Sequence, residues 1–163
     1  MVQNESMKYR TADEGDVITL AEMRWEFQTE DNDATPVVSK TEFVEFCSDF
    51  LRQGLLQKHR VYWIAEFDGE IVSHIFVQRV RGVPRPTWLT NAYGYISNVY
   101  TKPAYRRQGI GTELTQQVPS WAKQQEIDVL IVSISEASLT FYERAGFTAK
   151  NEWMECVIRN YPG

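Results

Sequence analysis

The stretch Tyr105-Arg106-Arg107-Gln108-Gly109-Ile110-Gly111-Thr112 places two spaced glycines and two arginines between a strand-like run, residues 95–100, and a helix-like run, residues 113–124. Glycines at the start of a helix let the backbone pass close to a ligand, because no Cβ stands in the way. The first amides of a helix have no partner within it, and the helix dipole leaves partial positive charge there. The stretch therefore predicts a site for phosphate oxygens.

A Gly-x-Gly pair alone is a weak signal, and a tight loop that caps a helix is the plainer interpretation. The context favours a ligand site, since the turn joins a strand to a helix with one apolar face. That face repeats at intervals of four, four and three residues, the spacing of a helix packed on a sheet, and consists of Ile110, Leu114, Val118 and Trp121.

The composition is that of an ordinary globular protein. The 163 residues fit one domain, residues 1–163, and 43% are hydrophobic and 24% charged. A net charge of -5 argues against a general nucleic-acid binder, whose phosphate contacts need a basic surface. No stretch reads as a signal segment or a membrane span, so we expect no membrane partner.

The cysteines and histidines do not predict a metal site. Cys47 and Cys156 lack metal-ligand or redox spacing and are expected to be small core residues, which favours a reducing, cytoplasmic setting. His59 and His74 have no neighbouring ligand residues, and each is expected on the surface or in the sheet. We therefore expect no metal.

The N-terminal third predicts a strand and two helices. A short strand at residues 8–10 precedes a helix that Asp13 or Asp16 can cap and that runs to about Phe27. Residues 28–38 are acidic and broken by a proline, and are expected to form a loop.

Ser39 and Glu42 form a capping-box pattern that opens the second helix, which we expect to end near Gly54. Its apolar side is expected to carry Phe43, Phe46, Cys47, Phe50 and Leu51.

The middle of the chain predicts a hairpin and a further strand. Residues 61–67 and 70–80 are rich in strand formers and are joined by Asp68-Gly69, a strong hairpin turn. Residues 81–91 contain two prolines and predict a loop, and residues 92–100 form the strand that leads into the glycine turn.

The C-terminal part predicts a buried strand at residues 129–132, a helix at residues 136–144 capped by Ser135 and ended by Gly146, and a last strand at residues 153–159. The order β-α-α-β-β-β-α-β-α-β predicts an α/β (α+β) fold, a mixed sheet with helices on its faces. Pro119 falls inside the helix that follows the glycine turn, where it removes a backbone hydrogen bond, so we expect a bend.

Two motifs in this order resemble the GCN5-related N-acetyltransferases (GNAT). Arg106-x-x-Gly109-x-Gly111 is similar to that family's acyl-CoA pyrophosphate loop, usually Gln/Arg-x-x-Gly-x-Gly/Ala. The run Phe141-Tyr142-Glu143-Arg144-Ala145-Gly146-Phe147 is similar to its later helix, Phe-Tyr-x-x-x-Gly-Phe. The element order matches over nearly the whole chain, and the specific motifs lie within residues 99–147. The resemblance implies the acyl-CoA N-acyltransferase fold, with a mostly antiparallel central sheet.

The resemblance also implies a donor site for acetyl-CoA as cosubstrate. Backbone groups of Val99, Tyr100 and Thr101 would pair with the pantetheine arm as an added strand. The pyrophosphate would lie on the loop residues Arg106, Arg107, Gln108, Gly109, Ile110, Gly111 and Thr112.

Tyr142 matches the tyrosine that donates a proton to the departing thiolate in many family members. Acetyl transfer to an amine needs a protonated leaving thiol and a stabilised oxyanion. Tyrosine has a reference pKa near ~10 and keeps its proton at neutral pH. The structural alternative is an aromatic that packs the helix on the sheet. Phe141 and Tyr142 are about 100° apart on a helix, so only one can point fully at the core.

Two positions depart from the family pattern. Arg107 stands where glycine is common, which is harmless if only its amide is used. Ser135 stands where an asparagine often contacts the CoA arm, and this change affects the expected affinity for CoA more than the expected activity.

The acceptor side carries no motif. The strand before the glycine turn offers no carboxylate as a general base. Acidic residues at the first helix could attract a cationic amine, although a solvated acidic loop is the plainer interpretation; they are Glu26, Glu30, Asp31 and Asp33. Aromatic residues that could wall the acceptor pocket, or equally form core or rim, are Trp25, Trp88 and Tyr93.

Three functions compete at this point. The first is an acetyl-CoA-dependent N-acetyltransferase that acts on a primary amine of a small molecule or peptide by direct attack in a ternary complex, and the resemblance makes a homodimer plausible. The second is a catalytically silent acyl-CoA-binding module with a regulatory role. The third is a nicotinamide dinucleotide enzyme, against which the late position of the two glycines and the missing early βαβ unit argue.

Overall fold

The computed structural model describes residues 6–30 and 35–149. The strands are β1 (Met7–Thr11), β2 (Arg60–Phe67), β3 (Glu70–Arg81), β4 (Ala92–Thr101) and β5 (Val129–Val132). The α-helices are α1 (Val17–Thr29), α2 (Lys40–Leu56), α3 (Ile110–Gln124) and α4 (Leu139–Arg144). Short 3₁₀ turns are η1 (Glu14–Asp16), η2 (Pro103–Tyr105) and η3 (Glu136–Ser138).

The strands form one sheet in the order β1-β2-β3-β4-β5. The first three pairs are antiparallel and β4 pairs with β5 in parallel. Only this last pair needs a crossover connection, which α3 provides. The predicted mixed, mostly antiparallel sheet flanked by helices is therefore confirmed.

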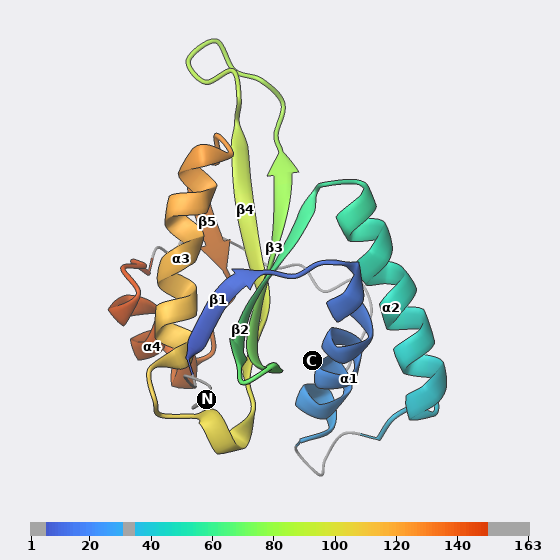
Figure 1. Ribbon diagram of the computed structural model, residues 1–163. Coiled ribbons are helices and arrows are strands. Elements are labelled where there is room, and N and C mark those ends of the chain that lie inside the picture. Colours follow the sequence, from blue (N-terminus) through green and yellow to red (C-terminus); the bar gives the residue numbers. More distant parts are fainter. Residues whose placement is uncertain (1–5, 31–34, 150–163) are drawn as a thin grey trace.

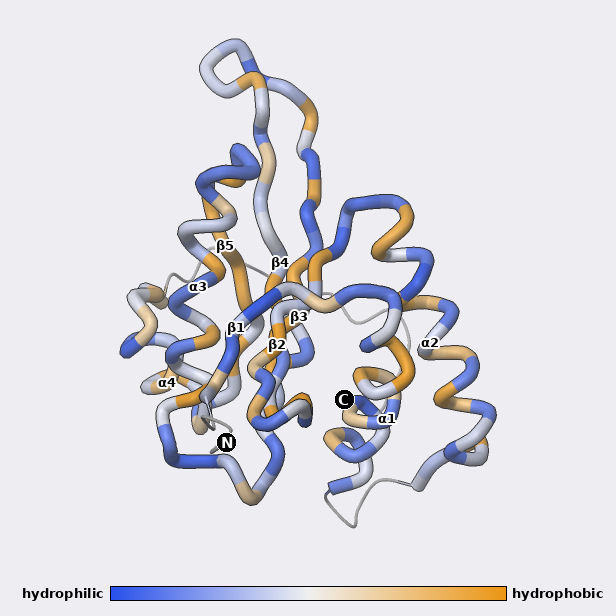
Figure 2. Tube along the Cα trace, viewed as in Figure 1, coloured by the Kyte–Doolittle hydropathy of each residue, from blue (hydrophilic) through white to orange (hydrophobic). Residues whose placement is uncertain are grey.

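Helices cover both faces of the sheet, α1 and α2 on one side and α3 and α4 on the other (Figure 1). The core on the first side joins Leu20 and Met23 of α1 to Tyr62 and Ile64 of β2. On the other side, the buried face of α3 packs on the residues of β3 and β4 that point that way. Figure 2 shows the hydrophobic residues of the strands gathered between the two helical layers.

Local signals in the sequence place several element ends correctly. Ser39 and Glu42 form the predicted capping box, with a 2.7 Å hydrogen bond from the Ser39 hydroxyl to a Glu42 carboxylate oxygen. Asp68 and Gly69 both have positive φ, 48° and 81°, as a tight hairpin turn requires. Gly146 ends the helical turn with φ 90°.

Helix α2 ends at Leu56, close to the predicted end near Gly54. Two other expectations about the elements are wrong. Phe46 and Phe50 are 78% and 48% exposed, so the apolar side of α2 is narrower than the sequence pattern predicted. Strand β5 is exposed or half-buried among the described residues rather than fully buried.

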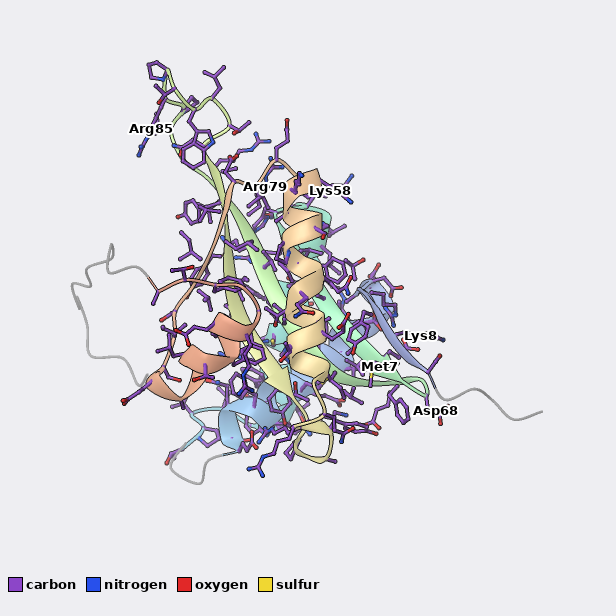
Figure 3. All side chains as sticks on the ribbon, turned by 90° about the vertical axis from the view of Figure 1, so that its left-hand side faces the viewer. Met7, Lys8, Lys58, Asp68, Arg79 and Arg85 are labelled. Atoms are coloured by element: carbon purple, nitrogen blue, oxygen red, sulfur yellow. The ribbon has the colours of Figure 1, made fainter. Side chains whose placement is uncertain are left out.

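Helix α3 is continuous through Pro119, so the proline does not break it. The loop between β3 and β4 projects beyond the sheet, and Arg85 lies on it, far from Met7 and Lys8 of β1 (Figure 3). The expected strand at residues 153–159 and Cys156 lie outside the described residues. Within those described, no helix is long and apolar enough to cross a membrane.

Candidate functional site

The glycine turn forms an exposed loop between β4 and α3. Arg107 and Gly109 have positive φ, 61° and 81°, and Gly109 is the N-cap of α3. A glycine fits this left-handed position without strain, whereas Arg107 does so at some energetic cost. The two residues turn the backbone sharply, so the loop presents its amide groups at the start of α3.

Six consecutive amides of this loop, those of residues 107–112, donate to no protein acceptor within the described residues. The first backbone hydrogen bond of α3 comes from Glu113, which donates to the Gly109 carbonyl over 2.9 Å. Free amides at a helix N-terminus form an anion site, and residues 106–109 are exposed. The geometry therefore fits the predicted pyrophosphate loop.

Arg106 is held beside the loop by an ion pair with Glu30, the residue that follows α1. Two guanidinium nitrogens contact the carboxylate over 2.6 and 2.7 Å. The Arg106 Nε donates to the Thr101 carbonyl over 2.8 Å. The hydrogen bond from Arg106 lowers the pKa of Glu30, and the same contact raises the pKa of Arg106. Of the acidic residues expected to be merely solvated, Glu30 thus makes a structural contact, and Asp31 and Asp33 lie outside the described residues.

The end of β4 separates from β5 where the predicted donor-strand residues lie. Pairing with β5 stops at Ile96 and Val132, while Tyr100 and Thr101 stay paired with β3. The backbone of residues 99–101 therefore has no β5 partner in the described part of the chain. Such an unpaired edge can accept an extended ligand as an added strand.

Tyr142 on α4 is the buried member of its aromatic pair. It is 7% exposed, with its ring centroid 4.9 Å from Phe141 and 5.6 Å from Phe147. Burial raises the pKa of Tyr142 to about 12, and Tyr95 adds to this effect. The hydroxyl therefore keeps its proton at neutral pH, which the role of general acid requires.

Helix α4 packs directly on the glycine loop. A Cβ at Gly111 would lie 3.4 Å from the Phe141 ring and 3.2 Å from the Thr101 hydroxyl. Gly111 thus allows the start of α3, the end of β4 and α4 to meet closely. This contact brings Phe141 to the donor loop and places Tyr142 next to it.

Tyr142 also lines a cavity of about 1470 Å³ between the β3–β4 loop, β5 and α4. Tyr93 and Trp88, two of the aromatics predicted to wall an acceptor pocket, line it as well. Trp25 does not, and its ring packs 5.5 Å from that of Phe43. The residues predicted to bind CoA do not line this cavity. Of the predicted site residues, Tyr142 is the one that does.

Ser135 is the N-cap of η3, and its hydroxyl donates to the Ser138 hydroxyl within this turn. The Ser135 amide donates to the Ser138 hydroxyl over 2.9 Å, and the two hydroxyls are 3.2 Å apart. The predicted cap is confirmed, and a contact with CoA stays a prediction.

Sequence reasoning missed a polar cluster at a bulge in β4. The register with β3 shifts between His74 and Phe76, and Asn98 has φ 50° in the bulge. His74 Nδ1 lies 2.7 Å from the Asn98 carbonyl oxygen, and Arg24 Nη1 donates to Asn98 Oδ1 over 2.8 Å. The left-handed preference of asparagine was the one available signal.

The unpaired end of β4 lies beside an exposed loop with free amides, an arrangement that suits an extended ligand with phosphate groups. A model of the acetyltransferase (GNAT) family matches residues 19–147. The chain belongs to this family.

The chain is similar to several acetyltransferases. It is 28% identical over 133 residues to a "Probable N-acetyltransferase camello" from Xenopus tropicalis, covering 74% of the chain and 58% of the relative. It is 32% identical over 74 residues to aminoglycoside N(6')-acetyltransferase type 1 from Acinetobacter baumannii, covering 45% and 51%. The chain thus spans only 58% and 51% of the length of these curated relatives.

A solved structure matches over almost its full length. It is a predicted acetyltransferase with acetyl-CoA from Clostridium acetobutylicum, 27% identical, with a TM-score of 0.78 and coverage of 94% of this chain and 97% of that one. An Arabidopsis thaliana glucosamine-6-phosphate N-acetyltransferase, 19% identical with a TM-score of 0.67, shares the fold over 95% of this chain.

Proposed function

We propose that the chain transfers an acetyl group from acetyl-CoA to a primary amine of a small molecule or peptide. The observation that carries this proposal is the run of six unpartnered amides at residues 107–112, beside the unpaired edge of β4. Family membership supports the donor, and the solved relative with acetyl-CoA supports it further.

The described residues fit this donor. Amides of residues 107–112 would hold the pyrophosphate, and backbone groups of Val99 and Thr101 would pair with the pantetheine arm. When bound, acetyl-CoA supplies the acetyl group as a thioester.

Tyr142 is proposed as the general acid. Its raised pKa keeps a proton on the hydroxyl, and this proton would go to the leaving thiolate as the C–S bond of the thioester breaks. The nitrogen that forms the new C–N bond would lose its own proton to water. The position of Tyr142 between the loop-contacting Phe141 and the cavity supports this role. The amine that attacks must be neutral, since an ammonium has no lone pair to form the new bond.

The test combines binding with turnover. The protein is incubated with acetyl-CoA and a panel of polyamines, aminoglycosides, amino acids and peptides, and release of free thiol is measured. Thermal unfolding with and without CoA reports donor binding separately. Amine-dependent thiol release supports the enzyme. Stabilisation by CoA without turnover would instead favour a silent acyl-CoA-binding module, and binding of NADH without CoA binding would reject both.

A further inference from the structure

Arg24 on α1 is a half-buried cation without a counter-ion among the described residues. Its guanidinium carbon lies 5.6 Å from the centroid of the Phe27 ring, and Nη1 donates to Asn98 Oδ1. A guanidinium carries five N–H donors, and this is the one hydrogen bond that Arg24 makes within the described residues. Burial is the main cause that lowers the pKa of Arg24, and the nearby Cys47 acts in the opposite direction.

Other arginines of the described part contrast with Arg24. Arg10 lies between two carboxylates, with contacts of 2.7 Å to Asp16 and 2.8 Å to Glu66. Arg106 contacts the Glu30 carboxylate through two nitrogens. Burying a cation without a partner is unfavourable, so a partly buried arginine with free donors is suited to an anionic ligand.

The bulge holds the partner of Arg24 in place. A carbonyl oxygen can only accept, so His74 Nδ1 carries the proton in its 2.7 Å contact with the Asn98 carbonyl. Complete burial lowers the pKa of His74 to about 4, so the ring is neutral at neutral pH. The positive charge of this cluster therefore belongs to Arg24 alone. The side-chain nitrogen of Asn98, Nδ2, is buried and donates to no acceptor among the described residues.

The cluster lies at the place where an acceptor would meet the donor. Asn98 immediately precedes Val99, the first residue of the unpaired β4 edge. The Phe27 ring, which Arg24 covers, stacks on Tyr100 of that edge at 5.1 Å between centroids. An anionic group bound to Arg24 would thus lie beside the β4 edge along which the donor is proposed to bind.

We propose that Arg24 binds an anionic group of the acceptor, so that the substrate is a primary amine that also carries a carboxylate or a phosphate. The free guanidinium donors match either group in a fork geometry. This inference rests on the proposed acetyl transfer, and it adds the chemical class of the acceptor.

Matched amines test the proposal. Glycine is compared with glycinamide for the carboxylate, and phosphoethanolamine with ethanolamine for the phosphate, by thiol release with acetyl-CoA. The anionic member of at least one pair should have a kcat/KM about ten- to hundredfold higher, from the strength of a charge-assisted hydrogen bond. The pair that shows the preference identifies the anion. Equal kcat/KM within both pairs would overturn the proposal.

Variants assign the preference to the side chain. Arg24→Gln should bring the kcat/KM ratio of the preferred pair close to one, mainly through KM. Arg24→Lys, which keeps the charge without the fork, should retain part of the ratio. Arg60→Gln is the matched control, since Arg60 also covers a phenylalanine ring, that of Phe50 at 4.4 Å, and it should keep the full ratio. A full ratio in Arg24→Gln would overturn the proposal.

Failure of the proposed function is distinguishable from failure of this inference. If no amine releases thiol, binding of glycine and phosphoethanolamine to the CoA-saturated protein is measured by calorimetry. Binding of either that Arg24→Gln weakens at least about tenfold supports the anion site without the reaction. Absence of binding, or equal binding by the variant, rejects the site.

Discussion

Replacing Tyr142 with phenylalanine removes one hydroxyl and leaves the packing of α4 intact. The ring contacts with Phe141 and Phe147 do not involve the oxygen, and the hydroxyl makes no hydrogen bond with a described residue. The free energy of unfolding should therefore change by less than about 0.5 kcal/mol. For a chain of this length, such a change moves the Tm by about 2 °C or less.

The effect on turnover should be far larger. A general acid contributes about 10²- to 10⁴-fold to the rate, so Tyr142→Phe should lower kcat by about that factor. The Kd for acetyl-CoA should stay within about twofold, because the loop amides and the β4 edge are unchanged. With a pKa raised to about 12, two units above the usual 10, Tyr142 stays protonated up to about pH 11. The wild-type kcat should therefore show no loss from this group between pH 8 and 10.

Thiol release measures kcat, and calorimetry with acetyl-CoA measures the Kd. Tyr95→Phe is the matched control, because Tyr95 lines the same cavity and is 39% exposed. It should keep kcat within about threefold, as expected for a surface substitution. An unchanged kcat in Tyr142→Phe, with normal folding, would remove Tyr142 from the mechanism and leave it as a packing residue.

Two further substitutions test the loop and the stability of the fold. Gly111→Leu should raise the Kd for CoA at least about tenfold, because a side chain at this position meets Thr101 and Phe141 and crowds the loop. Gly111→Ala should give a Kd between those of the wild type and Gly111→Leu. Unchanged affinity with normal thermal unfolding would refute the loop assignment. Asp16→Asn should destabilise the protein by about 1–2 kcal/mol at pH 7, because it removes the carboxylate charge and one of the two oxygens that accept hydrogen bonds from Arg10. Since the Arg10 contact lowers the folded pKa of Asp16 below its usual 3.8, this stability is present above about pH 4 and is lost as pH falls through the folded pKa. Urea unfolding at pH 7 and pH 3 should therefore show a smaller difference between wild type and variant at the lower pH, and an equal difference would contradict the linkage.

Signals confined to a few neighbouring residues were enough to predict much of the fold. The capping box at Ser39 and the turn at Asp68-Gly69 depend on backbone geometry within four residues, so they can be read without the tertiary structure. The exposure of Phe46 and Phe50 could not be read in this way. Their exposure depends on which side of α2 faces α1 and the sheet. The apolar residues of α2 cover a wider arc of the helix than this contact does, so the sequence pattern overstates the buried face.

The candidate site likewise has one part that neighbouring residues predict and one part that depends on distant segments. The glycine loop is contiguous in sequence, so its free amides could be expected from the spacing of Gly109 and Gly111. Arg24, His74 and Asn98 come from α1, β3 and β4, and they meet only because β4 bulges opposite β3. A bulge depends on the pairing of two distant strands, and no pattern within one strand specifies the partner.

The strand order β1-β2-β3-β4-β5 has a consequence for the way in which the site is assembled during folding. Strands β2, β3 and β4 are sequential antiparallel neighbours, so they can pair through short chain closures. The parallel β4–β5 pair closes only across α3, a longer loop with a larger entropic cost of closure, so we expect this pair to form more slowly. We therefore expect the β4 edge to form with the early, local part of the sheet, and the glycine loop and Tyr142 to join it when the β4–β5 crossover closes.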